Sequence, residues 1–509
     1  MIILRSGSIT LSDMNRLLFD GEKVTIDPTS MKNVHDCYSF LKDFARDKVI
    51  YGINTGFGPM AQYRVDDQHL HQLQYNLIRS HSSGTGKILP AIDIKAAMLA
   101  RVASFLRAYS GIHPSVIELL TEMVNRDIYP VIYEHGGVGA SGDLVQLAHL
   151  ALSLIGEGEV LFEGKIMPTG EAFSRQGLEP VKMHIREGLS LINGTSVMTG
   201  IGIVNLFNAQ KVLDWSLWAS SVICEIVGSF DDHFSSELNH AKDHEGQKVV
   251  AGKMRQMTQE SKRLRKRDEY FYHGKELQDV FTDKVQEYYS LRCVPQILGP
   301  VYDTLQNISA VLVSELNSAN DNPVIDVKHQ NVYHGGNFHG DYVAFEMDKL
   351  KIAITKLTML AERQLNYLMH DRINNLLPPF LNLGKPGLNY GMQAVQFTAT
   401  STTAECQTLS NPMYIHSIPN NNDNQDIVSM GTNAAVMART VIENAFQVLA
   451  IEIMAIIQAV TYLDIESQLS PFSRDIISRL KEVSPAFVED TPKYPGIKSL
   501  TDFLKNTRL

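Results

Sequence analysis

Apolar residues recur every three or four positions through most of the second half of the chain. The clearest run would form one apolar face of a helix. It consists of Leu350, Ile354, Leu357, Ala361, Leu365 and Leu368. An apolar stretch over 441–463 is interrupted by Glu443 and Glu452, and an isolated carboxylate is costly inside a bilayer. We therefore predict a core helix there, and a bundle of long, nearly parallel helices in this part of the chain.

The first part of the chain has a different character. Short helical patterns alternate with glycine-rich turns at 51–58, 84–86 and 136–142. The stretch 158–167 is weakly strand-like and has Glu163-Gly164 near its centre, which predicts a small hairpin. Because the character changes near residue 188, we expect a mainly α protein with two regions, 1–188 and 189–509.

Composition narrows the class of protein. The 509 residues are 44% apolar and 20% charged, as in soluble globular proteins, and the net charge of −10 argues against a nucleic-acid partner. The basic run 262–267 is therefore expected to be a solvated loop or helix end. The N-terminus has no apolar stretch of signal-peptide length. Four widely spaced cysteines, without a Cys-x-x-Cys pair, argue against disulfides and a zinc site and favour a reducing cytoplasm.

The candidate chemistry lies in residues 135–143, His-Gly-Gly-Val-Gly-Ala-Ser-Gly-Asp, which lead into a helical pattern. Glycines let the backbone bend and remove side chains that would keep one peptide group from another. The amide nitrogen of Gly142 can then attack the carbonyl carbon of Ala140, and loss of water from the ring and from Ser141 leaves an electrophilic methylene. The adjoining helix N-terminus favours negative charge. For this segment alone, capping of a helix by Ser141 and Asp143 is the simpler interpretation.

The wider context reverses that preference. Residues 140–143 after Gly-Gly-Val-Gly, with Leu-Ala-His at 147–149, resemble the signature of the histidine, phenylalanine and tyrosine ammonia-lyases. Six further blocks follow the family's order, at 51–58, 187–195, 289–293, 320–323, 336–339 and 424–426. One departure is Val145-Gln146, where many members have a proline, and we expect it to alter the start of the helix more than the chemistry.

The resemblance implies a 4-methylidene-imidazol-5-one cofactor (MIO) made from Ala140, Ser141 and Gly142, with no metal and no external cofactor. It also implies a fumarase/aspartase-like core, in which an MIO-bearing N-terminal region packs on a central bundle of long helices. The implied assembly is a homotetramer whose active sites each draw on three subunits. The implied partner is a small amino acid substrate, with neither nucleic acid nor a membrane.

The same resemblance assigns roles to individual residues. Tyr51 is expected to take the β proton of the substrate, and Arg292 to bind its carboxylate through two parallel hydrogen bonds. The residues that match positions around the MIO and the substrate are Asn193, Tyr289, Phe338 and, three residues before Tyr289, Gln286.

Two positions bear on the choice of substrate, and they disagree. The pair Ser80-His81 is usual in histidine lyases, whereas Gln425, after Asn424, stands where histidine lyases have a glutamate and tyrosine and phenylalanine lyases a glutamine. A glutamine lacks the charge that would pair with an imidazole, so we give it more weight. The stretches 58–63 and 80–86 also resemble a bacterial group of tyrosine ammonia-lyases. We therefore predict conversion of L-tyrosine to trans-4-coumarate, with His81 bonded to the phenol hydroxyl.

Other interpretations stay open. Conversion of L-histidine to urocanate is the nearest, and a tyrosine 2,3-aminomutase would use the same cofactor but return the ammonia to the β carbon. A non-catalytic helical scaffold would have no need of Tyr51, Ser141, Asn193 and Arg292 together. A pyridoxal-phosphate lyase would require a Schiff-base lysine, and no lysine lies in the matching blocks.

Overall fold

The computed structural model describes residues 1–272, 279–281 and 284–509, and these divide into two compact units. Unit 1 consists of residues 1–207, 308–348 and 412–439, and unit 2 of residues 208–307, 349–411 and 440–509. Each unit is therefore assembled from three segments of the chain. We predicted a division between residues 188 and 189 from a change in the sequence pattern. That division stays a prediction.

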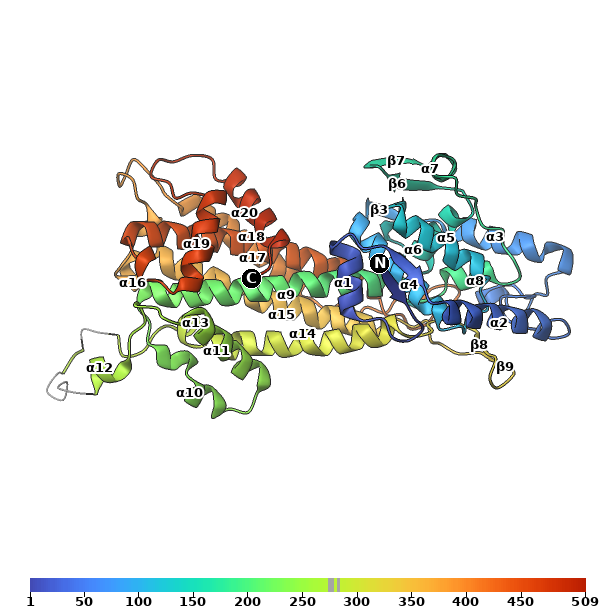
Figure 1. The fold of residues 1–509 in the computed structure, drawn as a ribbon, viewed down its shortest axis with the longest axis horizontal. Helices are drawn as coiled ribbons and strands as arrows, with labels where there is room; N and C mark the ends of the chain where they lie inside the picture. The colour runs from blue at the N-terminus through green and yellow to red at the C-terminus, as the bar shows by residue number, and fades with distance from the viewer. Residues whose placement is uncertain (273–278, 282–283) are drawn as a thin grey trace. The chain divides into compact units, whose positions relative to one another are not determined.

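Unit 1 combines short and medium helices with small β-elements (Figure 1). Its helices are α1 (Leu11–Phe19), α2 (Pro28–Phe44), α3 (Leu70–His81), α4 (Ala91–Leu106), α5 (Pro114–Asn125), α6 (Leu144–Leu154), α7 (Thr169–Gln176) and α8 (Glu187–Ile192). Its strands are β1 (Ile2–Leu4), β2 (Val24–Ile26), β3 (Thr85–Ile88), β4 (Tyr129–Pro130), β5 (Tyr133–His135), β6 (Glu159–Phe162), β7 (Lys165–Pro168), β8 (Val324–Asp326) and β9 (Asn331–Tyr333).

The β-structure of the described residues amounts to four small sheets, of which β1–β2 is parallel and the others are antiparallel. The predicted hairpin is confirmed, because β6 and β7 pair and are joined at Glu163 and Gly164. Both of these residues have positive φ, 51° and 74°, as tight hairpin turns require.

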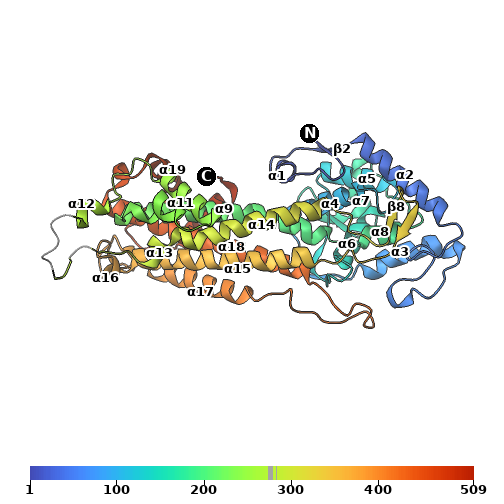
Figure 2. The same ribbon diagram turned by 90° about the horizontal axis from the view of Figure 1, so that it is seen from below.

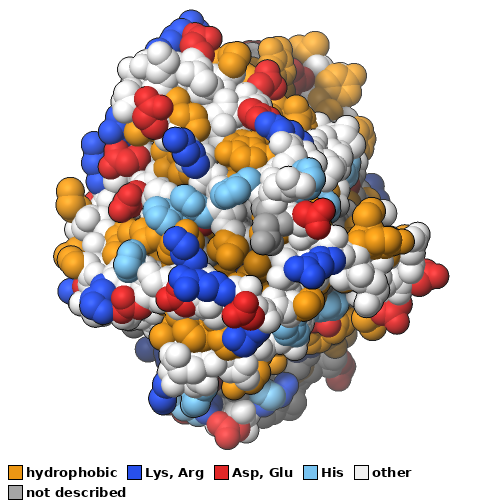
Figure 3. Space-filling model, turned by 90° about the vertical axis from the view of Figure 1, so that its right-hand side faces the viewer, with side chains coloured by type: hydrophobic (Ala, Val, Ile, Leu, Met, Phe, Trp, Pro, Cys, Tyr) orange, Lys and Arg blue, Asp and Glu red, His pale blue; other side chains and the backbone are white. Residues whose placement is uncertain are grey.

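Acidic and basic side chains are interspersed over the face shown in Figure 3.

Four long helices begin in one unit and end in the other: α9 (Ser196–Val227), α14 (Val294–Leu316), α15 (Asp341–Met369) and α18 (Gly431–Leu463). The helix predicted from apolar spacing is part of α15, and all six residues of its predicted apolar face are buried. Within unit 2, α9 and α15 lie side by side (Figures 1 and 2), and Ser220 Oγ is 3.1 Å from Gln364 Oε1. The predicted helical bundle is therefore present in unit 2.

The remaining helices of unit 2 are shorter. They are α10 (Ser236–His240), α11 (Glu245–Met257), α12 (Arg267–Phe271), α13 (Tyr289–Arg292), α16 (Asp371–Asn374), α17 (Gln393–Leu409), α19 (Pro471–Val483) and α20 (Tyr494–Asn506). The basic run 262–267 is a loop that leads into α12, and Lys262 and Lys266 are exposed as predicted, but two of its arginines are mostly buried. The side chains of Arg265 and Arg267 are about four-fifths buried and pair with Glu287 at 3.4 Å and Asp232 at 2.6 Å. A neighbouring carboxylate thus accounts for each buried charge.

Helix α18 contains the predicted core helix. By length and composition it is the one helix of the described residues that could cross a membrane, but 78% of its most apolar window is buried in the molecule. Burial raises the pKa of Glu452, which is fully buried within this helix, well above the ordinary range. Burial therefore favours the neutral acid over the carboxylate, which is the form that is costly to bury.

Candidate active site

Unit 1 contains a cavity of about 900 Å³ that gathers most of the predicted site residues. The predicted residues that line it are Tyr51, Ser80, His81, Ser141, Asn193, Phe338, Asn424 and Gln425. They come from six separate places in the chain: the loop before α3, the end of α3, the turn before α6, the end of α8, the loop before α15 and the loop before α18. The fold therefore brings the separate sequence blocks of unit 1 to one place.

The triad Ala140-Ser141-Gly142 lies in a tightly bent loop. Gly139 and Gly142 have φ values of 74° and 73°, in the left-handed region that favours glycine. Gly142 forms a bridge with Gly194, and a Cβ atom at Gly142 would overlap the carbonyl oxygen of Gly194. A residue with a side chain could not occupy this position without displacing the adjoining backbone.

Asp143 does not cap the helix that follows it. Helix α6 begins at Leu144 without a side-chain cap, and the Asp143 carboxylate instead accepts hydrogen bonds from Val197 N at 2.8 Å and Met198 N at 3.0 Å. These two N–H groups belong to the first turn of α9, and Thr432 donates to the other carboxyl oxygen. Burial raises the pKa of Asp143 to about 6 despite these bonds. The side chain joins the triad to the start of α9.

Three donors converge on Ser141. Gly194 N–H donates to its carbonyl oxygen at 3.3 Å, and Asn193 Nδ2 lies 3.4 Å from the same oxygen. Gln425 Nε2 donates to the Ser141 hydroxyl at 3.2 Å. With α6 starting three residues later, polar hydrogens surround this residue, an arrangement suited to developing negative charge on its carbonyl.

Tyr51 lies on the cavity wall in the loop that follows α2. Its hydroxyl oxygen accepts a hydrogen bond from Gly58 N at 3.0 Å, and its ring meets Phe57 edge to face at 6.1 Å. This backbone N–H fixes the position of the Tyr51 hydroxyl at the cavity wall. The contact supplies part of the hydrogen-bonding neighbourhood that a tyrosine base needs.

His81 ends α3 and is partly buried in the same cavity. Its Nδ1 lies 2.9 Å from the carbonyl oxygen of Leu77, which can only accept, so the proton of the neutral ring sits on Nδ1. Burial lowers the pKa of His81, and the bond to Leu77 opposes this shift. The ring is therefore mainly neutral near pH 7, and its Nε2 is an acceptor.

Three predicted residues lie elsewhere. Gln286, Tyr289 and Arg292 belong to unit 2, where they line a separate cavity of about 790 Å³. The Arg292 guanidinium lies 4.8 Å from the centre of the Tyr289 ring, and Tyr289 is 69% exposed. The cavity of unit 1 therefore lacks an arginine for a substrate carboxylate among its lining residues.

Sequence reasoning missed several residues of the main cavity. Leu73, Asn76 and Leu77 line it from α3, at helical spacing from Ser80 and His81. Their spacing of three and four residues was the available signal. His334, Asn421 and Asn422 also line the cavity, and no local pattern marks them.

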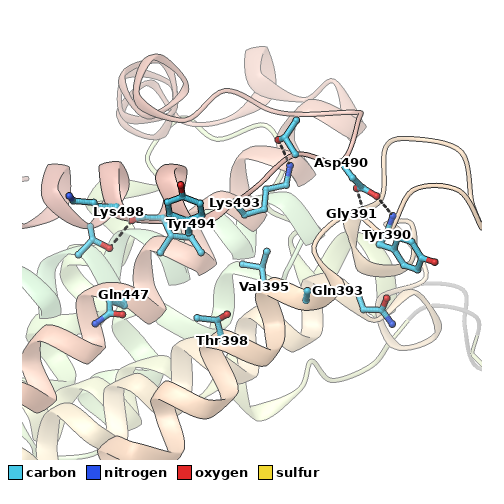
Figure 4. A pocket seen from close by; sticks show the side chains of 14 residues that line it. Tyr390, Gly391, Gln393, Val395, Thr398, Gln447, Asp490, Lys493, Tyr494 and Lys498 are labelled. Atoms are coloured by element: carbon cyan, nitrogen blue, oxygen red, sulfur yellow. Dashed lines mark hydrogen bonds between the residues drawn. The ribbon is translucent and has the colours of Figure 1, made fainter.

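A further cavity of about 780 Å³ lies in unit 2 between α17 and α20 (Figure 4). None of the predicted site residues lines it. The Asp490 carboxylate there accepts hydrogen bonds from the backbone of Tyr390 and Gly391, at 2.7 and 3.1 Å. This acid therefore serves to hold a loop, and we place the chemistry in the cavity of unit 1.

The family is settled by comparison with known proteins. The family model for aromatic amino acid lyases matches residues 9–482. The chain belongs to the aromatic amino acid lyase family. A histidine ammonia-lyase of Bacillus cytotoxicus is 37% identical to this lyase over 508 residues, which cover all of this chain and 97% of the relative. The enzyme is a carbon–nitrogen lyase of the ammonia-lyase type.

Solved structures agree with this fold. Phenylalanine aminomutase of Pantoea agglomerans superposes on the lyase with a TM-score of 0.95, at 33% identity, over 99% of each chain. Tyrosine aminomutase from Streptomyces globisporus has a TM-score of 0.94 at 34% identity, over 98% of this chain and 95% of the other. The predicted mainly helical, fumarase/aspartase-like fold is therefore confirmed.

The prediction of L-tyrosine as substrate is corrected by these comparisons. Relatives from Bacillus and Geobacillus that match at 36–37% identity over nearly the whole chain are named histidine ammonia-lyases. The prediction gave Gln425 more weight than the Ser80-His81 pair. In the lyase, the Gln425 amide donates to Ser141 Oγ, so this side chain is engaged with the triad and is a poor guide to the ring of the substrate.

Proposed function

We propose that the lyase forms its electrophile, the MIO group, from Ala140, Ser141 and Gly142. The single observation that carries this proposal is the packing of the triad against Gly194, which leaves no room for a Cβ atom at Gly142. The donors on the Ser141 carbonyl also fit such a group, as does the Oδ1 atom of buried Asn193, which has no hydrogen-bond partner among the described residues. When formed, the group supplies an electrophile that makes the substrate amine a better leaving group.

The chain's own residues would carry the rest of the reaction. Tyr51, with Gly58 N–H on its oxygen, would accept the β proton of the amino acid. Phe338 and Leu144 would provide apolar walls that limit access of water to the reacting atoms. Asn193 and Gly194 would hold negative charge at the carbonyl oxygen of Ser141.

We propose L-histidine as the substrate and urocanate and ammonia as the products. His81 supports this choice, because its neutral Nε2 can accept a hydrogen bond from an imidazole N–H. Asn76 and Ser80 lie on the same helix and line the same cavity. The names of the full-length relatives support the same substrate.

We also propose that the active site is completed between copies of the chain in a homotetramer. Tyr289, Arg292 and Gln286 line a different cavity from Tyr51 and Ser141, yet both sets match family positions. Arg292 of one copy would then bind the substrate carboxylate beside Tyr51 of another.

We propose a cytoplasmic location for the enzyme. The four cysteines are free thiols, three of them buried, which is compatible with a reducing compartment.

Intact-protein mass tests the electrophile. The wild-type chain should be lighter than its sequence by two water molecules, and Ser141→Ala should keep the full mass and lose turnover. Ser153→Ala, a buried serine in α6 away from the triad, is the matched control and should lose both waters. A wild-type chain of full mass that turned over substrate would refute the proposal.

Mixed tetramers test the shared site. Tyr51→Phe and Arg292→Ala should each be inactive alone, and co-refolding the two variants should restore part of the activity. In some of the mixed assemblies an intact Tyr51 meets an intact Arg292. Activity that stays absent in verified mixed assemblies would contradict a site built from several copies.

The aminomutase similarity favours a second candidate. Two aminomutases superpose on the lyase with TM-scores of 0.94 and 0.95, so return of ammonia to the β carbon is the alternative fate of the same intermediate state. Chromatography of the products separates the two outcomes. A β-amino acid as the main product would replace the proposed lyase reaction, whereas urocanate with free ammonia supports it.

A further inference from the structure

Helix α4 carries a single arginine within an apolar stretch. Arg101 follows Ala-Ala-Met-Leu-Ala and precedes Val-Ala-Ser-Phe-Leu, and its side chain is fully buried. The guanidinium lies 4.4 Å from the centre of the Phe105 ring. A buried cation is costly unless its hydrogen-bond donors are used, so its partners indicate its purpose.

The Arg101 guanidinium donates mainly to backbone carbonyl oxygens in residues 190–193, the segment that adjoins the triad. Arg101 Nη2 donates to the carbonyl oxygen of Asn193 at 2.8 Å and also to the carbonyl oxygen of Ser190, and Nη1 lies 3.5 Å from Asn320 Oδ1. Burial lowers the pKa of Arg101 to about 10, with Asp321 opposing the shift. The side chain is therefore a cation at neutral pH.

The contact with Asn193 extends to Ser141 through one peptide group. The carbonyl of Asn193 and the N–H of Gly194 belong to the same planar trans peptide and point in opposite directions. Arg101 donates to the first, and the second donates to the Ser141 carbonyl oxygen at 3.3 Å. Hydrogen bonds in series polarise one another, so a cation on the Asn193 oxygen strengthens the Gly194 N–H as a donor.

Steric packing fixes the same line of groups. A Cβ atom at Gly194 would lie 2.5 Å from Arg101 Nη1 and 2.6 Å from the carbonyl oxygen of Asn320. A Cβ atom at Gly142 would overlap the Gly194 carbonyl on the other side. Gly194 is thus held between the guanidinium and the triad.

We propose that Arg101 is a positioning residue for formation of the electrophile, acting through the Asn193–Gly194 peptide on the Ser141 carbonyl. This inference rests on the proposed function. Cyclisation forms a bond from Gly142 N to the Ala140 carbonyl carbon and a double bond from that carbon to Ser141 N. The Ala140 oxygen leaves as water with the protons of the Gly142 and Ser141 amides. The Ser141 hydroxyl leaves as a second water with the Ser141 Cα proton.

The last of these losses explains why a polarised donor matters. The Cα proton of Ser141 is adjacent to the Ser141 carbonyl, so its removal places negative charge on that oxygen. The Gly194 N–H meets that oxygen, and Arg101 meets the other end of the same peptide. Removing an oxyanion donor outright costs roughly 10²–10³-fold in rate, and weakening one costs less, about tenfold.

The rate of cyclisation tests the inference without using turnover. Full-length wild type, Arg101→Lys and Arg101→Met are made by cell-free synthesis and sampled over time, and the mass of the peptide containing residues 140–142 reports loss of two waters. We expect Arg101→Met to cyclise about tenfold more slowly than wild type, and Arg101→Lys, which keeps the charge but not the forked geometry, to lie between them.

Arg186→Met is the matched control. Arg186 is equally buried and pairs with Asp321 at 3.0 Å, but it makes no hydrogen bond to the Asn193–Gly194 peptide. It should lower the thermal stability while cyclising at the wild-type rate. Equal slowing in Arg186→Met and the Arg101 variants would overturn the inference, because general destabilisation would then be the cause.

Wild-type rates in the Arg101 variants would overturn it as well. Should Arg101→Met fail to fold, Arg101→Lys decides, since it keeps the charge and most of the side-chain volume. A wild-type chain that never loses two waters would instead refute the proposed function, so the two failures are distinguishable.

Discussion

Replacement of Glu187 by glutamine should remove a pH dependence from the stability of unit 1. Glu187 opens α8, the helix that ends beside Asn193, and its side chain is fully buried. Its carboxyl oxygens accept hydrogen bonds from His113 N at 3.2 Å and from His184 N. Burial nevertheless raises the pKa of Glu187 from 4.5 to about 8.

The direction of the effect follows from the raised pKa. Below about pH 4.5 the side chain is neutral in both the folded and the unfolded chain, and its contribution to stability is fully present. Between this pH and about 8 the unfolded chain ionises while the folded chain does not, so stability falls by about 1.4 kcal/mol per pH unit. Across two pH units the loss is about 3 kcal/mol. Glu187→Gln keeps an acceptor for the N–H donors but cannot ionise.

Hydrogen–deuterium exchange of α8 measures this directly. The difference in opening free energy between wild type and Glu187→Gln should change by about 3 kcal/mol from about pH 5.5 to 7.5, in the direction that favours the variant. Taking the difference removes the contributions of His113 and His184, which both proteins share. Glu179→Gln, at an exposed position before α8, is the control and should behave as wild type. Parallel curves for wild type and Glu187→Gln would refute the reasoning.

Three further predictions concern the site. Tyr51→Phe should lower kcat at least about 100-fold, because the proposed proton acceptor is lost, while thermal melting shows stability changed by less than about 1 kcal/mol; wild-type kcat would contradict the assignment. Asp143→Ala should destabilise the protein by about 3 kcal/mol in urea unfolding, since two N–H groups of α9 lose their acceptor; an unchanged midpoint would contradict that role. His81→Leu should raise KM for L-histidine about tenfold in steady-state assays, because the proposed acceptor for the imidazole N–H is lost; an unchanged KM would contradict histidine binding there.

Local patterns predicted local structure well. The apolar face of α15 and the hairpin β6–β7 depend on residues close in sequence, and both are present. Asp143 shows where this reasoning ends. A residue before a helix is expected to cap that helix, but its carboxylate instead caps α9, more than fifty residues later. The course of the folded backbone decides which N–H groups an acceptor reaches. The spacing of residues in the sequence does not give this information.

The candidate site divides in the same way. Sequence blocks identified Tyr51, Ser141 and Asn193, and the fold brings these into one cavity. Arg101 was missed, because its partner Asn193 lies 92 residues away and nothing near Arg101 marks a site. A lone charge in an apolar helix was the available signal, since such a charge requires polar partners.

The most direct test is the stoichiometry of ammonia release from L-histidine by the purified enzyme. We predict one ammonia for each histidine consumed, with the ultraviolet band of urocanate rising in step and both signals absent in Ser141→Ala. No ammonia from histidine, with ammonia released from a different ring-bearing amino acid, would contradict the proposed substrate. No ammonia from any amino acid would contradict the proposed reaction itself.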